Sequence, residues 1–239
     1  MAESSDISAD EVPTWVEGDN WSYRSNESYR VQNYTSEVVS EREHIDIDDT
    51  IFDCYMVNYT IDDFVETHFY TIDGLSLVAE MSEEGALAYN PTLKRFEFPL
   101  DVGTTWDSAT IIWREPEDGG TWEKQQEWEL EFKVEEITTV EVPAGTFDTY
   151  VINITQYEGM GEFVEYYYYS PEVKNMVKRE EYLYGTLQLT EELTDYELME
   201  REDDDDGIPF LNTGIIILTM AASAVIYSFH YKKKGKGHQ

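Results

Sequence analysis

Two histidines, His44 and His68, are the side chains outside the C-terminal region that suit general acid–base chemistry near neutral pH. A Ser-His-Asp hydrolase would need one of them beside an activated serine, and the sequence has no Gly-x-Ser-x-Gly elbow. Two carboxylates could instead hydrolyse a glycosidic bond. With 51 Asp and Glu residues, however, finding carboxylate pairs is uninformative. We therefore predict no catalytic residues and a protein that is not an enzyme.

The sequence gives equally little support for a metal site or a reactive thiol. Cys54 is the only cysteine, so the chain cannot form an internal disulfide, and no CxxC, haem or zinc pattern is present. The run from Asp203 to Gly207 resembles the start of a calcium loop, but no Glu follows at the EF-hand spacing. We predict no metal and no cofactor, and we interpret Cys54 as a buried structural thiol.

The charge of the chain limits its partners. A formal net charge of −35 argues against direct binding to nucleic acid, because phosphate contacts need basic residues. Three interpretations remain: a solvated acidic surface suited to high salt, diffuse binding of divalent cations, or an electrostatic partner site. The acidic residues are spread over the whole region before Gly207, which favours the first.

Five of the eight asparagines begin an Asn-x-Ser/Thr sequon, where chance would give about one. These candidate glycosylation sites are Asn20, Asn26, Asn33, Asn58 and Asn153. Sequons of this kind indicate surface positions in an exported protein.

The chain contains an internal repeat. Three signals occur twice in the same order: Gly-x-x-Trp, then FDCYMVNYT or FDTYVINIT, then Phe-Val-Glu. They begin at Gly18, Phe52 and Phe64 in the first copy and at Gly103, Phe147 and Phe163 in the second. We therefore predict a tandem duplication, with copies at residues 14–97 and 98–198. The ten extra residues of the second copy, around its Gly-Gly pair, predict a longer hairpin there.

Each copy has the pattern of β-strands. From Trp128 to Val134 apolar and charged residues alternate, and the two nine-residue strings alternate likewise. The segment EELTDYELMERE is the one helix candidate before the C-terminal region. We predict an all-β fold, a large antiparallel sheet or sandwich of about ten to twelve strands. Only Pro91 and Pro99 mark the junction of the copies, so we expect one continuous domain.

The ends of the chain differ from its body. Residues 208–231 carry no Asp, Glu, Lys or Arg, and as a helix of about 36 Å they would cross about 30 Å of hydrocarbon. We predict a transmembrane helix there, an acidic juxtamembrane spacer at 199–207 and a basic cytoplasmic tail at 232–239. The basic flank predicts that the tail lies in the cytoplasm and the acidic domain outside the cell membrane. The alternative is a tail-anchored protein with its domain in the cytoplasm, which would have to export its lysines.

Residues 1–13 are expected to form a disordered acidic N-terminus. They show neither the basic start nor the apolar core of an export signal. A processed or trimmed chain, a misplaced start, or insertion driven by the anchor itself would each explain this.

Several segments together resemble uncharacterised, β-rich cell-envelope proteins of archaea and bacteria. The segments are FPLDVGTTW, VPAGTF and YYYSPEVKNMVKRE, which match the motifs PL-x-VG-x-x-W, VPAGTF and YYSPEV-x-x-VK of that set. The C-terminal part is similar to the anchors of archaeal surface proteins, although the Pro-Gly-Phe of one sorting class is absent. Some members of the set look distantly like the curved sheets of bacterial lipoprotein carriers, which implies a possible ligand cavity.

From these observations we expect a single-pass, outward-facing membrane protein with a binding or structural role in the envelope and no catalysis. The alternative is a carrier or sensor that binds an apolar (lipid) or glycan ligand in a cavity of a curved β-sheet, with the run of tyrosines from Tyr166 as one candidate wall. A glycoside-acting enzyme is the third possibility. The expected partners are the membrane and an envelope protein, lipid or glycan, but not nucleic acid.

Overall fold

The structure is a computed structural model, which describes residues 7–9, 11–27, 30–47, 50–115, 122–158 and 161–200. The predicted transmembrane helix at 208–231, the basic tail and the acidic run at 203–206 lie outside the described residues. Among the residues that are described, no helix has the length and apolar character needed to span a bilayer.

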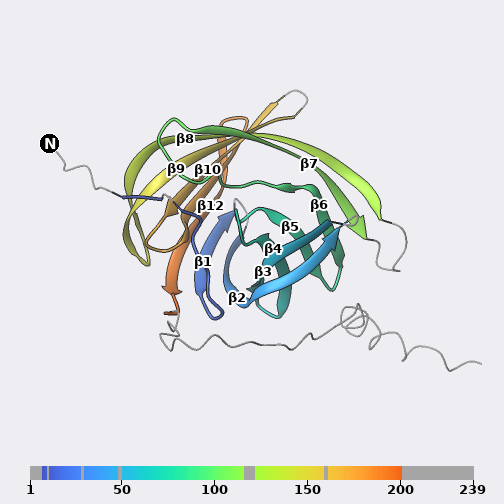
Figure 1. Ribbon diagram of the computed structural model, residues 1–239. Coiled ribbons are helices and arrows are strands. Elements are labelled where there is room, and N and C mark those ends of the chain that lie inside the picture. The colour runs from blue at the N-terminus through green and yellow to red at the C-terminus, as the bar shows by residue number, and fades with distance from the viewer. Residues whose placement is uncertain are drawn as a thin grey trace, which may run out of the picture. The chain divides into compact units, whose positions relative to one another are not determined.

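Twelve antiparallel strands make up the regular structure of the described residues. Their bounds are β1 Asn20–Glu27, β2 Arg30–Ile47, β3 Thr50–Ile61, β4 Phe64–Thr71, β5 Leu77–Ser82, β6 Gly85–Leu93, β7 Thr105–Glu115, β8 Glu123–Val142, β9 Gly145–Glu158, β10 Gly161–Ser170, β11 Asn175–Leu183 and β12 Thr186–Glu197. Each strand pairs with its neighbours in sequence, and β1 also pairs with β12, so the sheet closes into a barrel (Figure 1).

The barrel confirms the predicted all-β fold and the predicted number of strands. The sandwich, which we gave as one of two possible arrangements of those strands, is wrong. The first strand of the first copy pairs with the last strand of the second, so a single sheet has no open edge. The helix candidate is also wrong, because most of EELTDYELMERE belongs to β12. Pairing with both β1 and β11 satisfies its backbone groups and outweighs its local helix propensity.

Alternation along the strands divides the residues between the interior and the outer face. Ile152 and Ile154 of β9 and Val57 of β3 are buried inside the barrel, as the two nine-residue strings predict. Asn58 and Asn153 lie on the opposite, outer face of the same strands.

One end of the barrel interior is filled by aromatic side chains, among them Trp15 from the segment before β1 and Trp21 from the start of β1. The Trp15 ring lies 5.4 Å from the rings of Trp21 and Tyr55. The indole nitrogens of Trp15 and Trp21 donate hydrogen bonds to the carbonyl oxygens of Lys174 and Val173, at 3.0 and 2.9 Å. These bonds tie the start of the chain to the β10–β11 turn.

The segment between β6 and β7 crosses the same end of the barrel (Figure 1). The Arg95 guanidinium lies over the ring of Tyr70 on β4, and the Phe96 ring lies 5.3 Å from that of Tyr169 on β10. Tyr70 and Tyr169 belong to different halves of the barrel, so this segment bridges them. We call this filled end, built around Trp15, Trp21 and residues 95–98, the aromatic plug.

The expected disorder of residues 1–13 is wrong for residues 7–9. Ala9 is buried and its carbonyl oxygen accepts a hydrogen bond from the Leu100 amide, at 3.0 Å. The Ile7 carbonyl oxygen accepts another from the Tyr150 hydroxyl. Hydrogen bonds to Leu100 and Tyr150 therefore hold residues whose composition gives no sign of order.

A second, smaller cluster lies on the outer face of β3, β4 and β5. It contains Cys54, Phe69, Val78 and Ala79, with partly buried side chains of β2 and β3 packed against it. Cys54 is fully buried, which confirms the interpretation of this thiol. Burial, together with nearby carboxylates, raises the pKa of the Cys54 thiol to about 12.

Candidate functional site

The end of the barrel opposite the aromatic plug contains a cavity of about 340 Å³ that is partly open to solvent. Leu130 and Phe132 of β8, Ile154 of β9 and Phe163 of β10 form much of its apolar wall. The polar lining comes from Arg95, Gln126, Trp128, Gln156, Glu165 and Tyr167. We call this space the barrel cavity.

Arg95 lies where the barrel cavity meets the aromatic plug, because it also lines a small void of about 30 Å³ among the plug residues. Its guanidinium carbon is 5.9 Å from the centre of the Tyr70 ring, a cation–π distance. No ion pair found among the described residues involves Arg95. Burial acts to lower the pKa of Arg95, but the nearby tyrosines and Glu80 outweigh burial and raise it. Arg95 is thus a charged group that feels the Glu80 carboxylate at a distance but forms no direct ion pair with a carboxylate of the described residues.

Trp128 presents a second unsatisfied donor. Its indole nitrogen Nε1 is buried and has no hydrogen-bond partner. The ring packs near Tyr89, with 6.3 Å between the ring centres. An unpaired buried donor costs about 1–3 kcal/mol, so this group is expected to find a partner when the cavity is filled.

Glu165 is the one carboxylate among the residues lining the barrel cavity, and it is already paired. Its two oxygens lie 3.3 and 3.4 Å from Nε and Nη2 of Arg179. The same guanidinium also bonds Glu181 and, at 3.2 Å, Glu191. One cation therefore serves three carboxylates, of which Glu191 is buried and Glu165 and Glu181 are half-buried. Burial raises the pKa of Glu181.

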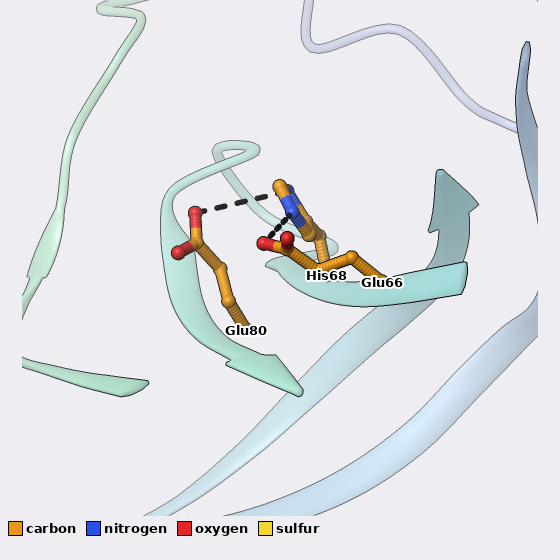
Figure 2. A group of neighbouring side chains, drawn as sticks. All are labelled: Glu66, His68 and Glu80. Atoms are coloured by element: carbon orange, nitrogen blue, oxygen red, sulfur yellow. Dashed lines mark hydrogen bonds and ion pairs between the residues drawn. The ribbon is translucent and has the colours of Figure 1, made fainter. Parts of the chain in front are cut away.

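A second polar cluster faces the interior from β4 and β5 (Figure 2). His68 Nε2 lies 2.8 Å from Oε1 of Glu66, and His68 Nδ1 lies 3.1 Å from the Tyr70 hydroxyl and 3.8 Å from Oε1 of Glu80. The other oxygen of Glu80 accepts a hydrogen bond from the Tyr89 hydroxyl, at 3.0 Å. The hydrogen bond with His68 lowers the pKa of Glu66, against the opposing effect of burial.

Glu66, His68 and Glu80 are also side chains of the kinds that bind metal ions, and their ligand atoms lie within 4.8 Å of one another. The two carboxylates, however, face different nitrogens of the same imidazole. A metal ion bound to one ring nitrogen would replace the hydrogen bond of that nitrogen. The carboxylate on the other side of the ring would have to move to the same side to bind the ion as well. We therefore interpret the group as a hydrogen-bonded cluster in which the His68 imidazole lies between the carboxylates of Glu66 and Glu80.

The two polar clusters occupy equivalent positions in the two halves. Alignment of the Phe-Val-Glu segments pairs Glu66 with Glu165 and His68 with Tyr167. The same offset relates Leu75 to Lys174, and both have positive φ, at 53° and 58°. Each half of the barrel thus has one pair of strands with charged side chains facing the interior: β4 and β5 in the first half, and β10 and β11 in the second.

The structure separates the residues that could have formed a hydrolytic site. His44 lies on β2, where its Nδ1 pairs with Asp53 at 2.7 Å and its side chain is exposed. His68 faces the interior from β4. Of the sequons, Asn26 and Asn33 are exposed, whereas Asn20, Asn58 and Asn153 are half-buried.

The polar groups of the interior were missed from sequence, although a signal existed. Glu66 shares the inward parity of Tyr70, and Glu165 shares that of Tyr169. Burying a charged side chain without a partner is costly, so a charged residue on the inward face of an amphipathic strand predicts an oppositely charged or hydrogen-bonding partner inside the fold. Arg95 gave no such signal, because it lies outside the strands.

Known proteins give no family assignment: no family model and no curated protein matches the chain. Two solved structures have a similar strand arrangement. One is a proposed exported protein with a YmcC-like fold from Bacteroides fragilis, with 12% identity, a TM-score of 0.48, and coverage of 79% of this chain and 99% of that chain. The other is a proposed lipoprotein from Parabacteroides distasonis, with 14% identity, a TM-score of 0.43, and coverage of 81% and 100%. Neither likeness supports a functional assignment.

Proposed function

We propose that this protein binds a small apolar or amphiphilic ligand inside its barrel, at the outer side of the cell membrane. The observation that carries the proposal is the barrel cavity, a concave space of about 340 Å³ with an apolar wall and a few polar groups. Small-molecule sites typically measure about 300–1,000 Å³ and have this kind of lining. The carrier or sensor alternative is thus better supported than a purely structural role.

The two ends of the interior support this choice. A structural barrel would be packed throughout, as it is at the aromatic plug, where Trp21 and Tyr169 are buried. The opposite end keeps its space and contains the unsatisfied Trp128 nitrogen. Native interiors rarely leave both a void and an unpaired polar group unless something occupies them.

The proposal includes no catalysis. A glycoside-acting site would need two carboxylates that face one substrate. The residues lining the barrel cavity include a single carboxylate, Glu165, and Arg179 already binds both of its oxygens. His68 is likewise engaged at both ring nitrogens.

The membrane anchor and the outward orientation are part of the proposal and are supported by sequence. An uncharged stretch at 208–231 lies between an acidic run and a lysine-rich tail. Peptide mapping of protein from its own host tests the orientation. We expect glycans first at Asn26 and Asn33, the exposed sequons, and five unmodified asparagines would count against an outward domain.

Native mass spectrometry of the full-length protein tests the proposed function, with the protein purified from its host in an amphipathic polymer free of lipid. We expect an extra mass that survives gentle ionisation and leaves on denaturation. Leu130→Trp, which places a large ring in the cavity wall, should abolish the extra mass. Leu187→Trp, at an exposed position of β12, is the matched control and should keep it. An empty wild-type barrel would contradict the proposal.

A further inference from the structure

We propose that the ligand of the barrel cavity carries an anionic oxyacid headgroup, a carboxylate or a phosphate, which Arg95 and the indole N–H of Trp128 bind. This inference rests on the proposed function and specifies its ligand. Both residues line the cavity. The Trp128 nitrogen is buried without a hydrogen-bond partner among the described residues, and Arg95 forms no ion pair with any of them.

The sign of the headgroup follows from which charges are already paired. Among the described residues, the two polar clusters of the interior contain five glutamates, so an excess of negative charge could suggest a cationic ligand. Arg179, however, binds three of them, His68 binds Glu66, and Glu80 accepts the Tyr89 hydroxyl. Of the charged groups lining the cavity, Glu165 is occupied and Arg95 has no ion-pair partner. The group that remains available is cationic.

The geometry of the two donors suits an oxyacid. A guanidinium presents its N–H groups as a planar fork that matches the two oxygens of a carboxylate or phosphate. The Trp128 nitrogen can only donate, so it also needs an acceptor. The amides of Gln126 and Gln156 line the same space and offer further donors.

The position of Arg95 also gives the ligand a direction. Arg95 lies at the floor of the cavity, where the aromatic plug begins. The apolar wall continues from Ile154 and Phe163 to Leu183, which is 41% exposed at the rim. A headgroup at the floor therefore places an apolar tail along the wall and toward the rim. This arrangement specifies an anionic amphiphile rather than a free anion.

Calorimetric titration with a matched set of probes tests the inference. The chain cut after Glu200 is suitable, because it keeps all twelve strands and both pairings that close the barrel. The probes are decanoate, decyl phosphate, decanol and decyltrimethylammonium, with acetate and inorganic phosphate as anions without a tail. We expect the two decyl anions to bind at least about tenfold more tightly than decanol, as a hydrogen-bonded ion pair predicts. The ammonium compound and the two tail-free anions should bind more weakly than decanol.

Variants assign the headgroup contact. Arg95→Gln should weaken decanoate binding by about tenfold to a hundredfold and leave decanol binding unchanged. Trp128→Phe keeps the ring, removes the N–H and should weaken decanoate binding by a smaller factor. Arg42→Gln, an exposed arginine on β2, is the control and should change neither. A second readout is the titration of carboxyl-¹³C decanoate, whose bound pKa should be low in the wild type and return to its free value in Arg95→Gln.

The outcomes separate the two proposals. If decanol and the decyl anions bind equally and Arg95→Gln affects neither, the cavity takes apolar ligands and the headgroup inference is wrong. Tighter binding of the ammonium compound would also overturn it. If no decyl probe binds, the proposed function fails and the inference fails with it. If Arg95→Gln does not fold, the affinities of the probes for the wild type and for Trp128→Phe still decide whether the cavity prefers an anionic headgroup.

Discussion

Glu66 and Glu165 face the barrel interior from equivalent positions of the two halves, and each is held by a different basic side chain. Glu66 bonds the imidazole of His68 on its own strand, whereas Glu165 bonds the guanidinium of Arg179 on the next strand. The position of Arg179 in the first half is occupied by Glu80. The two halves therefore present the same carboxylate with different partners, and of the two carboxylates only Glu165 lines the barrel cavity.

The Glu66 carboxylate should make stability depend on pH. The hydrogen bond with His68 lowers the folded-state pKa of Glu66 below its usual value of 4.5. The contribution of Glu66 is therefore present above pH 4.5 and is lost as the pH falls through the lower folded-state pKa. We expect Glu66→Gln to be less stable than wild type at pH 7 and the difference to shrink toward pH 3. Urea unfolding at a series of pH values measures this, with Glu129→Gln at an exposed position as the control. A difference that is the same at both pH values would contradict it.

Removing Arg179 should be costly at neutral pH. Arg179→Gln leaves Glu165, Glu181 and Glu191 without their shared cation, and breaking a largely buried pair costs about 3 kcal/mol. Burial raises the pKa of Glu181 and Arg179 acts against that rise, so without the cation the folded-state pKa of Glu181 should lie further above its unfolded value and stability should recover as the pH falls. Arg24→Gln breaks an exposed pair with Glu192 and should cost less than about 1 kcal/mol. Equal costs for the two variants in denaturant unfolding would contradict the interpretation.

Gly18 and Gly103 offer a matched pair of substitutions. Both have a φ of 94°, and their amides donate at 2.8 Å to the carbonyl oxygens of Val38 and Val134. Gly103→Ala adds a methyl group to open space, so it should cost only backbone strain, on the order of 1–2 kcal/mol. Gly18→Ala should cost more, because its methyl group would lie 3.1 Å from Cγ of Met199. Thermal unfolding of both variants measures the difference, which Met199→Ala should remove.

The Cys54 thiol should be inert in the folded protein. Burial raises its pKa from 9.0 to about 12, which lowers the thiolate fraction by about a thousandfold even before access is considered. We expect a disulfide reagent to label Cys54 at the rate of global unfolding, and rapidly in denaturant. Fast labelling of the native protein would mean that the outer cluster around Phe69 opens locally.

Much of the strand pattern could be predicted from sequence. Alternation from Trp128 to Val134 places side chains on two faces, because successive residues of a strand point in opposite directions. The VPAGTF motif likewise predicts the turn observed between Val142 and Gly145. Such signals are local, since they depend on neighbours in the chain.

The candidate site could not be predicted in this way. Arg95 meets Tyr70 and Trp128 lines the same cavity only after the segment between β6 and β7 crosses the barrel. Pairing of β1 with β12 depends on the twist and register of the whole sheet, so a sequence pattern that fits a sandwich fits a barrel equally well.

The sequence by itself determined that this protein is a β-structure of repeated strands, because residue alternation and turn chemistry act between near neighbours. The tertiary structure alone decided that the sheet closes, that residues 7–9 are held by Leu100 and Tyr150, and that Arg95 and Trp128 share one cavity. These are contacts between residues distant in sequence, and their energies depend on burial and pairing that exist only in the folded barrel.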